Sequence, residues 1–110
     1  MSGAAAAQAL SAQIQRDLVN FVNFTGLVRV ETLAVTDWAS VTFVGARHCL
    51  RVHLEGPGAV GAAADFLGDL GERHYPLPGH IVADIALLSE ERRDGGGYAS
   101  MDLEVLTIES

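Results

Sequence analysis

Cysteine is almost absent from this chain of 110 residues, since Cys49 is the only one. A single cysteine cannot form a disulfide within the chain, so nothing in the sequence points to an oxidising compartment. We therefore expect a cytoplasmic protein.

Lysine is missing altogether, and seven arginines stand against fourteen acidic residues, which gives a net charge of −7. The arginines are scattered along the sequence and form no basic run that would offset this charge. Phosphate backbones and anionic membrane surfaces would be repelled. The composition therefore argues against nucleic-acid and membrane partners. The lack of lysine beside so much alanine also suggests the coding bias of a GC-rich bacterial genome.

Long apolar runs are missing too, and none approaches the roughly 20 residues that a membrane-spanning helix needs. The alanine-rich start resembles a secretory leader only faintly, because it lacks a positive region and Gln8, Gln13 and Gln15 interrupt it. With 49% hydrophobic and only 19% charged residues, the chain is too apolar to remain disordered. We expect residues 1–110 to form a single α+β domain around a hydrophobic core.

Hydrophobic periodicity predicts two amphipathic helices. Apolar residues recur every three or four positions over residues 4–24, and Gly26 is placed to end that helix. A second helix begins near Pro57, with Gly71 as its cap. Its expected apolar stripe consists of Val60, Ala63, Ala64, Leu67 and Leu70.

Five strands are predicted around these helices. β-Branched and alternating residues mark the ranges 27–36, 41–44, 49–55, 80–90 and 98–109. Thr36-Asp37 ends the first, and Gly45-Ala46-Arg47 supplies the turn of a hairpin between the second and third. The order α-β-β-β-α-β-β predicts one antiparallel-dominated, five-stranded sheet with both helices packed on one face.

The register of the last hairpin follows from its apolar faces. Odd positions carry the richer apolar set on both strands, so odd residues must pair with odd residues. Pairing Arg93 with Gly97 across a loop of residues 94–96 satisfies this rule. The expected pairs are then Leu87 with Leu103 and Ile85 with Val105 on one face, and Val82 with Ile108, Asp84 with Leu106, Ala86 with Glu104 and Leu88 with Asp102 on the reverse face.

Residues 56–61 match the G-x-G-x-x-G spacing of dinucleotide-binding loops. Such a site needs a doubly buried parallel strand before the loop, but Arg51 and His53 alternate with apolar residues there, which is typical of a sheet with one solvated face. We interpret the glycines as a tight strand-to-helix turn and expect no cofactor.

Soft metal ligands are present without a metal pattern. The potential ligands are His48, Cys49, His53, His74 and His80, and their spacing matches no zinc site, so no metal is expected. Arg47 and Arg51 lie two residues from Cys49 on its own strand face and could lower the pKa of its thiol. A small core or interface cysteine is the interpretation that we prefer, so we expect Cys49 to be non-catalytic.

A cluster of charged and polar residues is the strongest candidate for a reactive site in the sequence. If residues 49–55 lie beside the last hairpin, Arg51 and His53 share a sheet face with Asp84, Asp102 and Glu104. A histidine beside carboxylates can act as a general base, which makes Asp84 and His53 the candidate catalytic residues. The alternative is a solvated, salt-bridged face of little energetic weight. Arg51 and the loop aromatics Trp38 and Tyr75 are the candidate ligand contacts, although core packing explains the aromatics equally well.

These observations lead to two functional hypotheses. The first is a non-enzymatic, self-associating interaction or regulatory module, with a homodimer formed by Val82, Leu88, Leu106 and Ile108 on the sheet face away from the helices. The second is a small enzyme or ligand-binding protein with a pocket between the helices and the sheet that uses Asp84 and His53. The absence of a nucleophile or metal motif favours the first.

Overall fold

A computed structural model describes residues 3–93 and 95–110, so Asp94 of the predicted hairpin loop lies outside the described residues. The elements in chain order are α1 (Gly3–Asn20), β1 (Leu27–Ala39), β2 (Val44–Glu55), α2 (Ala59–Gly68), the 3-10 turn η1 (Leu70–Glu72), β3 (His80–Arg92) and β4 (Tyr98–Glu109). The domain is α+β.

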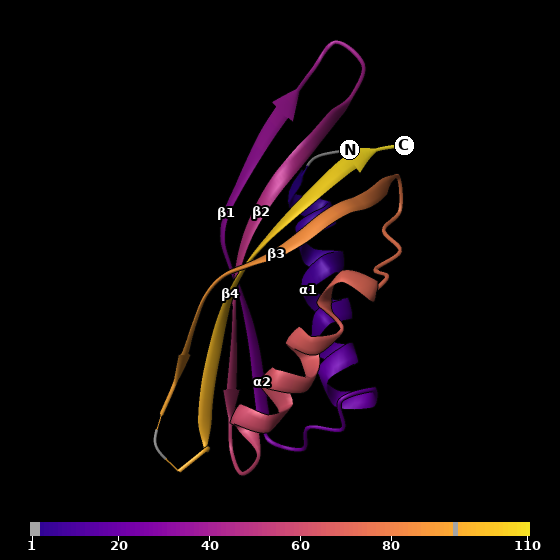
Figure 1. The fold of residues 1–110 in the computed structure, drawn as a ribbon. Helices are drawn as coiled ribbons and strands as arrows, with labels where there is room; N and C mark the ends of the chain where they lie inside the picture. The colour runs from indigo at the N-terminus through magenta and orange to yellow at the C-terminus, as the bar shows by residue number, and fades with distance from the viewer. Residues whose placement is uncertain (1–2, 94) are drawn as a thin grey trace.

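The strands form a single antiparallel sheet with the order β1-β2-β4-β3. Strand β4 lies between β2 and β3, so β2, α2 and β3 form a split β-α-β unit. Both helices lie on the same side of the sheet (Figure 1). We call the side that they cover the inner face and the opposite side the outer face.

The prediction of five strands is wrong, because the described residues form four. Residues 45–47 do not turn but continue β2, and the chain reverses at Ser40–Phe43 instead. There the amide of Ser40 donates to the Phe43 carbonyl at 2.7 Å, and the amide of Phe43 donates to the Ser40 hydroxyl at 3.0 Å. Thr36-Asp37, expected to end a strand, lies inside β1.

Gly45 was interpreted as a turn residue, but in the structure it allows close packing between neighbouring strands. A Cβ atom at this position would lie 1.9 Å from the Thr107 carbonyl oxygen and 2.9 Å from the indole of Trp38. Trp38 is the β1 residue paired with Gly45, and its ring covers the glycine backbone. Only a residue without a side chain allows β2 and β4 to approach here.

The predicted register of the β3–β4 hairpin is correct in its centre and wrong at both ends. Leu87 pairs with Leu103, Ile85 with Val105, Asp84 with Leu106 and Ala86 with Glu104. Bulges between Val82 and Asp84 and between Leu87 and Ser89 each insert one residue. Each insertion reverses the alternation of side chains beyond it. Val82 therefore pairs with Thr107 on the inner face, Ile81 replaces it opposite Ile108, and Ser89 replaces Leu88 opposite Asp102.

The core lies between the inner face and the helices. Helix α1 ends at Asn20, earlier than expected, and buries Leu10, Ile14 and Leu18. Helix α2 ends at Gly68, and its buried residues are Ala59, Ala62, Ala63 and Phe66. Of the predicted stripe, Ala63 is buried, and Val60, Leu67 and Leu70 are only partly buried against the core. The inner face contributes Leu50, Val52, Leu54, Met101, Leu103 and Val105, all fully buried. Small alanines let α2 lie close to the sheet, with Phe66 as its one large core side chain.

The molecule is elongated, with extents of 49 × 23 × 21 Å. Figure 1 shows the β1–β2 hairpin extending beyond the helices at one end of the sheet. No helix among the described residues is long and apolar enough to cross a membrane.

Candidate functional site

The outer face divides along the strands into an apolar half and a charged half. One cross-strand row joins Trp38, Gly45, Ile108 and Ile81, and Leu106 follows in the next row. We call Trp38, Ile81, Leu106 and Ile108 the apolar half. Two of these residues belong to the predicted self-association set. Of the other two members of that set, Val82 lies on the inner face and Leu88 lies in a bulge, where it is exposed.

The charged half contains the polar cluster that the sequence predicted except Asp84, which pairs with Leu106 in the apolar half. The Arg51 guanidinium binds the Asp102 carboxylate with two hydrogen bonds of 2.8 and 3.0 Å, and the Ser89 hydroxyl donates to the same carboxylate at 3.3 Å. The bonds from Arg51 hold the pKa of Asp102 below its usual range. Arg47 lies 3.7 Å from Glu104. The pairing of the strands places these residues on one face, as predicted. Each arginine is paired with a carboxylate, and the role of Arg51 as a ligand contact stays a prediction.

His53 has partners other than those predicted. Its Nδ1 lies 3.2 Å from the Tyr98 hydroxyl and its Nε2 lies 3.3 Å from a Glu31 carboxylate oxygen. Asp84 lies in the cross-strand row of Arg47, six residues along β2 from His53. At roughly 3.3 Å per residue this is about 20 Å. Asp84 and His53 therefore cannot act on one substrate atom together.

The thiol of Cys49 is half-buried on the outer face. Arg47 and Arg51 flank it along β2, but each pairs with a carboxylate of β4. The positive charges of Arg47 and Arg51 are thus already compensated, and a non-catalytic role of Cys49 stays a prediction. Among the described residues, no group of three or more His, Cys, Asp or Glu side chains could hold a metal ion.

The loop of residues 56–61 is occupied by the chain itself. The amide of Gly56 donates to the Gly97 carbonyl at 2.9 Å, and the amide of Val60, in the first turn of α2, donates to the Gly96 carbonyl at 3.2 Å. These two hydrogen bonds hold the start of α2 against the loop of the β3–β4 hairpin. Amides that a phosphate would need are already used.

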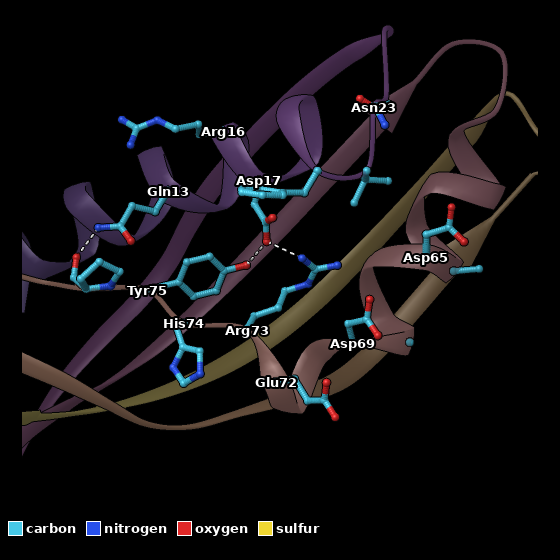
Figure 2. A pocket seen from close by; sticks show the side chains of 15 residues that line it. Gln13, Arg16, Asp17, Asn23, Asp65, Asp69, Glu72, Arg73, His74 and Tyr75 are labelled. Carbon is cyan, nitrogen blue, oxygen red and sulfur yellow. Dashed lines mark hydrogen bonds and ion pairs between the residues drawn. The ribbon is translucent and has the colours of Figure 1, made fainter.

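A groove of about 1210 Å³ lies between α1 and α2 (Figure 2). It is therefore on the side of the sheet opposite the outer face that carries His53 and Asp84. It includes neither of those residues, so the pocket and the candidate catalytic pair are separate. Tyr75, one of the predicted ligand contacts, does line the groove, but Trp38 does not.

A buried polar cluster forms the wall of this groove. The Asp17 Oδ2 atom accepts hydrogen bonds from Arg73 Nη1 at 2.7 Å and from the Tyr75 hydroxyl at 2.8 Å. The Arg73 side chain stacks 4.6 Å from the centre of the Phe66 ring and donates to the Phe66 carbonyl. Burial and the Asp17 carboxylate raise the pKa of Tyr75 strongly, so the phenol stays protonated as a donor. We call Asp17, Arg73 and Tyr75 the Asp17 cluster.

Sequence reasoning missed Asp17 and Arg73. Arg73 stands in a region without periodicity and gave no signal. Asp17 did have a detectable sequence signal, because it lies three residues after Ile14 and directly before Leu18, on the apolar side of the helix. A carboxylate at a core-facing position demands a partner.

His48 is a second buried polar group, fully enclosed on the inner face. Its Nε2 lies 3.0 Å from the Thr107 hydroxyl, and its Nδ1 has no partner within the described part of the chain. Burial, reinforced by His80 and partly opposed by Asp37, lowers the pKa of His48 below 6.5.

This shift predicts a pH dependence of stability. Below pH 6.5 the unfolded chain binds a proton at His48 that the folded chain does not, so the free energy of unfolding decreases as the pH falls from 6.5 towards the folded pKa. Urea unfolding at several pH values between 7.5 and 5 measures the slope of the free energy of unfolding against pH. In His48→Gln the slope should be flatter, whereas exposed His74→Gln should leave it unchanged. Equal slopes in wild type and His48→Gln would contradict the assignment.

Comparisons with protein-family models, with curated proteins and with solved structures find no match to this chain. Function must therefore be argued from its own surfaces.

Proposed function

We propose that this protein is a cytoplasmic, self-associating interaction module that forms a homodimer through the outer face of its sheet. The observation that carries the proposal is the apolar half of that face. Ile81 is 57% exposed, and Trp38, Leu106 and Ile108 are half-buried. An antiparallel sheet with one face in water normally presents polar residues there. Apolar side chains gathered on such a face favour burial against a second surface.

The size of the face supports a pairing of whole sheets. With strands about 4.8 Å apart and residues about 3.3 Å apart, four strands of some eleven paired residues cover roughly 700 Å². A stable interface of ordinary size buries about 800 Å² on each partner. The net charge of −7 on each copy opposes association only over about 8 Å at physiological salt. Nearly the entire outer face would therefore take part.

A two-fold axis parallel to the strands would bring each half of the outer face against the same half of the second copy. It places apolar half against apolar half and charged half against charged half, with β1 of one copy over β3 of the other. Trp38 of one copy then packs over Ile81 of the second. The Arg51–Asp102 pairs are neutral within each copy, so their approach carries little repulsion. Aligned packing at an angle of about 30° between strands is the common arrangement for two sheets.

The only cysteine provides a direct test of this arrangement. Cys49 lies on a central strand of the outer face, and two sheets pack about 10 Å apart, so the two thiols of a dimer should come within roughly 10 Å. A bismaleimide with a span of about 8 to 10 Å should therefore link two chains in high yield at micromolar protein. Failure to link, together with a solution mass of one 11.6 kDa chain, would exclude the face-to-face dimer.

Leu106→Asp is expected to yield a monomer. The new carboxylate lies opposite Asp84 in the apolar half, where a second copy would have to bury both charges. Light scattering measures the mass. Val41→Asp, in the fully exposed β1–β2 turn, makes the same chemical change outside the face and should leave the mass unchanged. If Leu106→Asp stays folded and dimeric, the outer face is not the interface.

The enzymatic alternative lacks support from the geometry. Its two residues, Asp84 and His53, lie far apart on the outer face, and the groove on the other side contains neither.

A further inference from the structure

In the wall of the groove between α1 and α2, the mostly buried Asp17 carboxylate has one oxygen that the Asp17 cluster does not use. Asp17 is only 8% exposed, and both of its hydrogen bonds are made by Oδ2. The second oxygen, Oδ1, accepts no hydrogen bond from the described residues. A carboxylate removed from water gains most from a further donor, and a cationic donor is the strongest that a protein can offer.

The lining of the groove as a whole carries more negative than positive charge. Figure 2 shows Asp65 and Asp69 on the α2 side of the groove, with Glu72 following on η1 and Arg16 extending away from the Asp17 cluster on the α1 side. Arg73 is already paired with Asp17. Among the lining residues four carboxylates face two guanidinium groups, a difference of −2. The field in the groove therefore attracts positive charge.

An apolar side chain completes the surface. Phe21, just after the end of α1, lines the groove and is 78% exposed. Val22 follows it in the lining, whereas Pro76 lies at the other end of the groove, beside Gln13. An exposed phenylalanine in a groove lined by carboxylates offers an apolar side chain a hydrophobic contact and a cation the face of its ring.

We propose that this groove binds a segment of a partner protein that carries arginine or lysine beside an apolar residue. One basic side chain reaches Asp17 Oδ1, a second is held by Asp65 and Asp69, and the apolar residue packs on Phe21. A second copy of this chain does not fit the role. Its only basic residues are seven arginines, several of which already pair with its own acids, and its net charge of −7 would be repelled by the acidic groove.

The dimensions favour a peptide over a small metabolite. Pockets for small ligands enclose about 300 to 1,000 Å³, whereas this groove measures about 1210 Å³ and is open. Along α1 its lining runs from Gln13 to beyond Asn20, which is about 10 Å of helix at 1.5 Å per residue. That length suits two turns of a helical segment. The groove lies on the face away from the proposed dimer interface, so its use does not depend on the dimer.

A random library of 12-residue peptides displayed on phage, selected against the full chain, tests the proposal. Enriched peptides should contain at least two basic residues next to an apolar one. The best of them, made as a free fluorescent peptide, should bind the wild type at 100 mM salt in an anisotropy titration. Asp65→Asn/Asp69→Asn should weaken its binding by about tenfold, the effect of losing one to two charge-assisted contacts.

A control variant distinguishes binding in the groove from a general attraction between the basic peptide and the acidic protein. Glu90→Gln/Glu91→Gln removes two exposed acids of β3, away from the groove, and should change the affinity less than twofold. Amide chemical shifts should move on α1 and α2 and not on the outer face. The proposal is overturned if the library shows no basic enrichment, if both double variants weaken binding equally, or if millimolar spermidine displaces the peptide completely. A failed dimer test with successful peptide binding would leave this proposal standing alone.

Discussion

Asp17→Ala is expected to destabilise the fold by about 3 to 5 kcal/mol, the usual result of removing one partner of a buried ion pair. The Asp17 and Arg73 side chains are only 10% and 11% exposed, so water from the groove replaces the lost carboxylate only in part. The guanidinium would stay buried without its counter-charge, and the Tyr75 hydroxyl would lose its acceptor. The cluster also joins α1 to the segment after η1, so its loss should loosen the docking of α1.

Urea unfolding followed by circular dichroism measures this effect. Tyr75→Phe keeps the ion pair and removes only a hydrogen bond, so it should cost about 1 kcal/mol. Asp65→Asn, an exposed carboxylate on the same groove, should stay within about 0.5 kcal/mol of wild type. A loss below about 1 kcal/mol in Asp17→Ala would mean that water reaches the pair and that its burial has little energetic consequence.

Gly45→Ala should destabilise the protein by at least about 2 kcal/mol, at the upper end of the range for an overpacked site. The added methyl group would meet the Thr107 carbonyl at 1.9 Å, and that atom belongs to the backbone of β4. Backbone cannot rotate away as a side chain can, so β2 and β4 must separate where Trp38 covers them. Hydrogen exchange should therefore increase first at Gly45, Ala46 and Thr107.

Gly61→Ala is the matched control, since it adds the same methyl group in open space. Nothing lies within 4 Å of its position in α2. Alanine favours a helix interior over glycine, so this variant should gain about 0.5 to 1 kcal/mol. If the two substitutions shift the unfolding midpoint by the same amount and sign, the tight contact at Gly45 is not the cause.

For the candidate site, the sequence could place residues on a face but could not pair them. Alternation along a strand has a period of two, which was sufficient to bring Arg51 and Asp102 to the same side of the sheet. Which acid each cation meets depends on strand order and register. The prediction therefore found the charged half of the outer face but joined His53 with Asp84 instead of Glu31 and Tyr98.

By itself the sequence determined the α+β class, the two helices and the central register of the last hairpin. These features come from local hydrophobic periodicity, which each segment carries in its own residues. Only the tertiary structure decided the number of strands, the bulges at Ala83 and Leu88, and the pairing of Asp17 with Arg73, 56 residues apart. A bulge forms where contacts across the sheet outweigh regular pairing, and Gly45 is extended because of what packs on it. Such choices depend on neighbours that are distant in the chain, and no local pattern contains them.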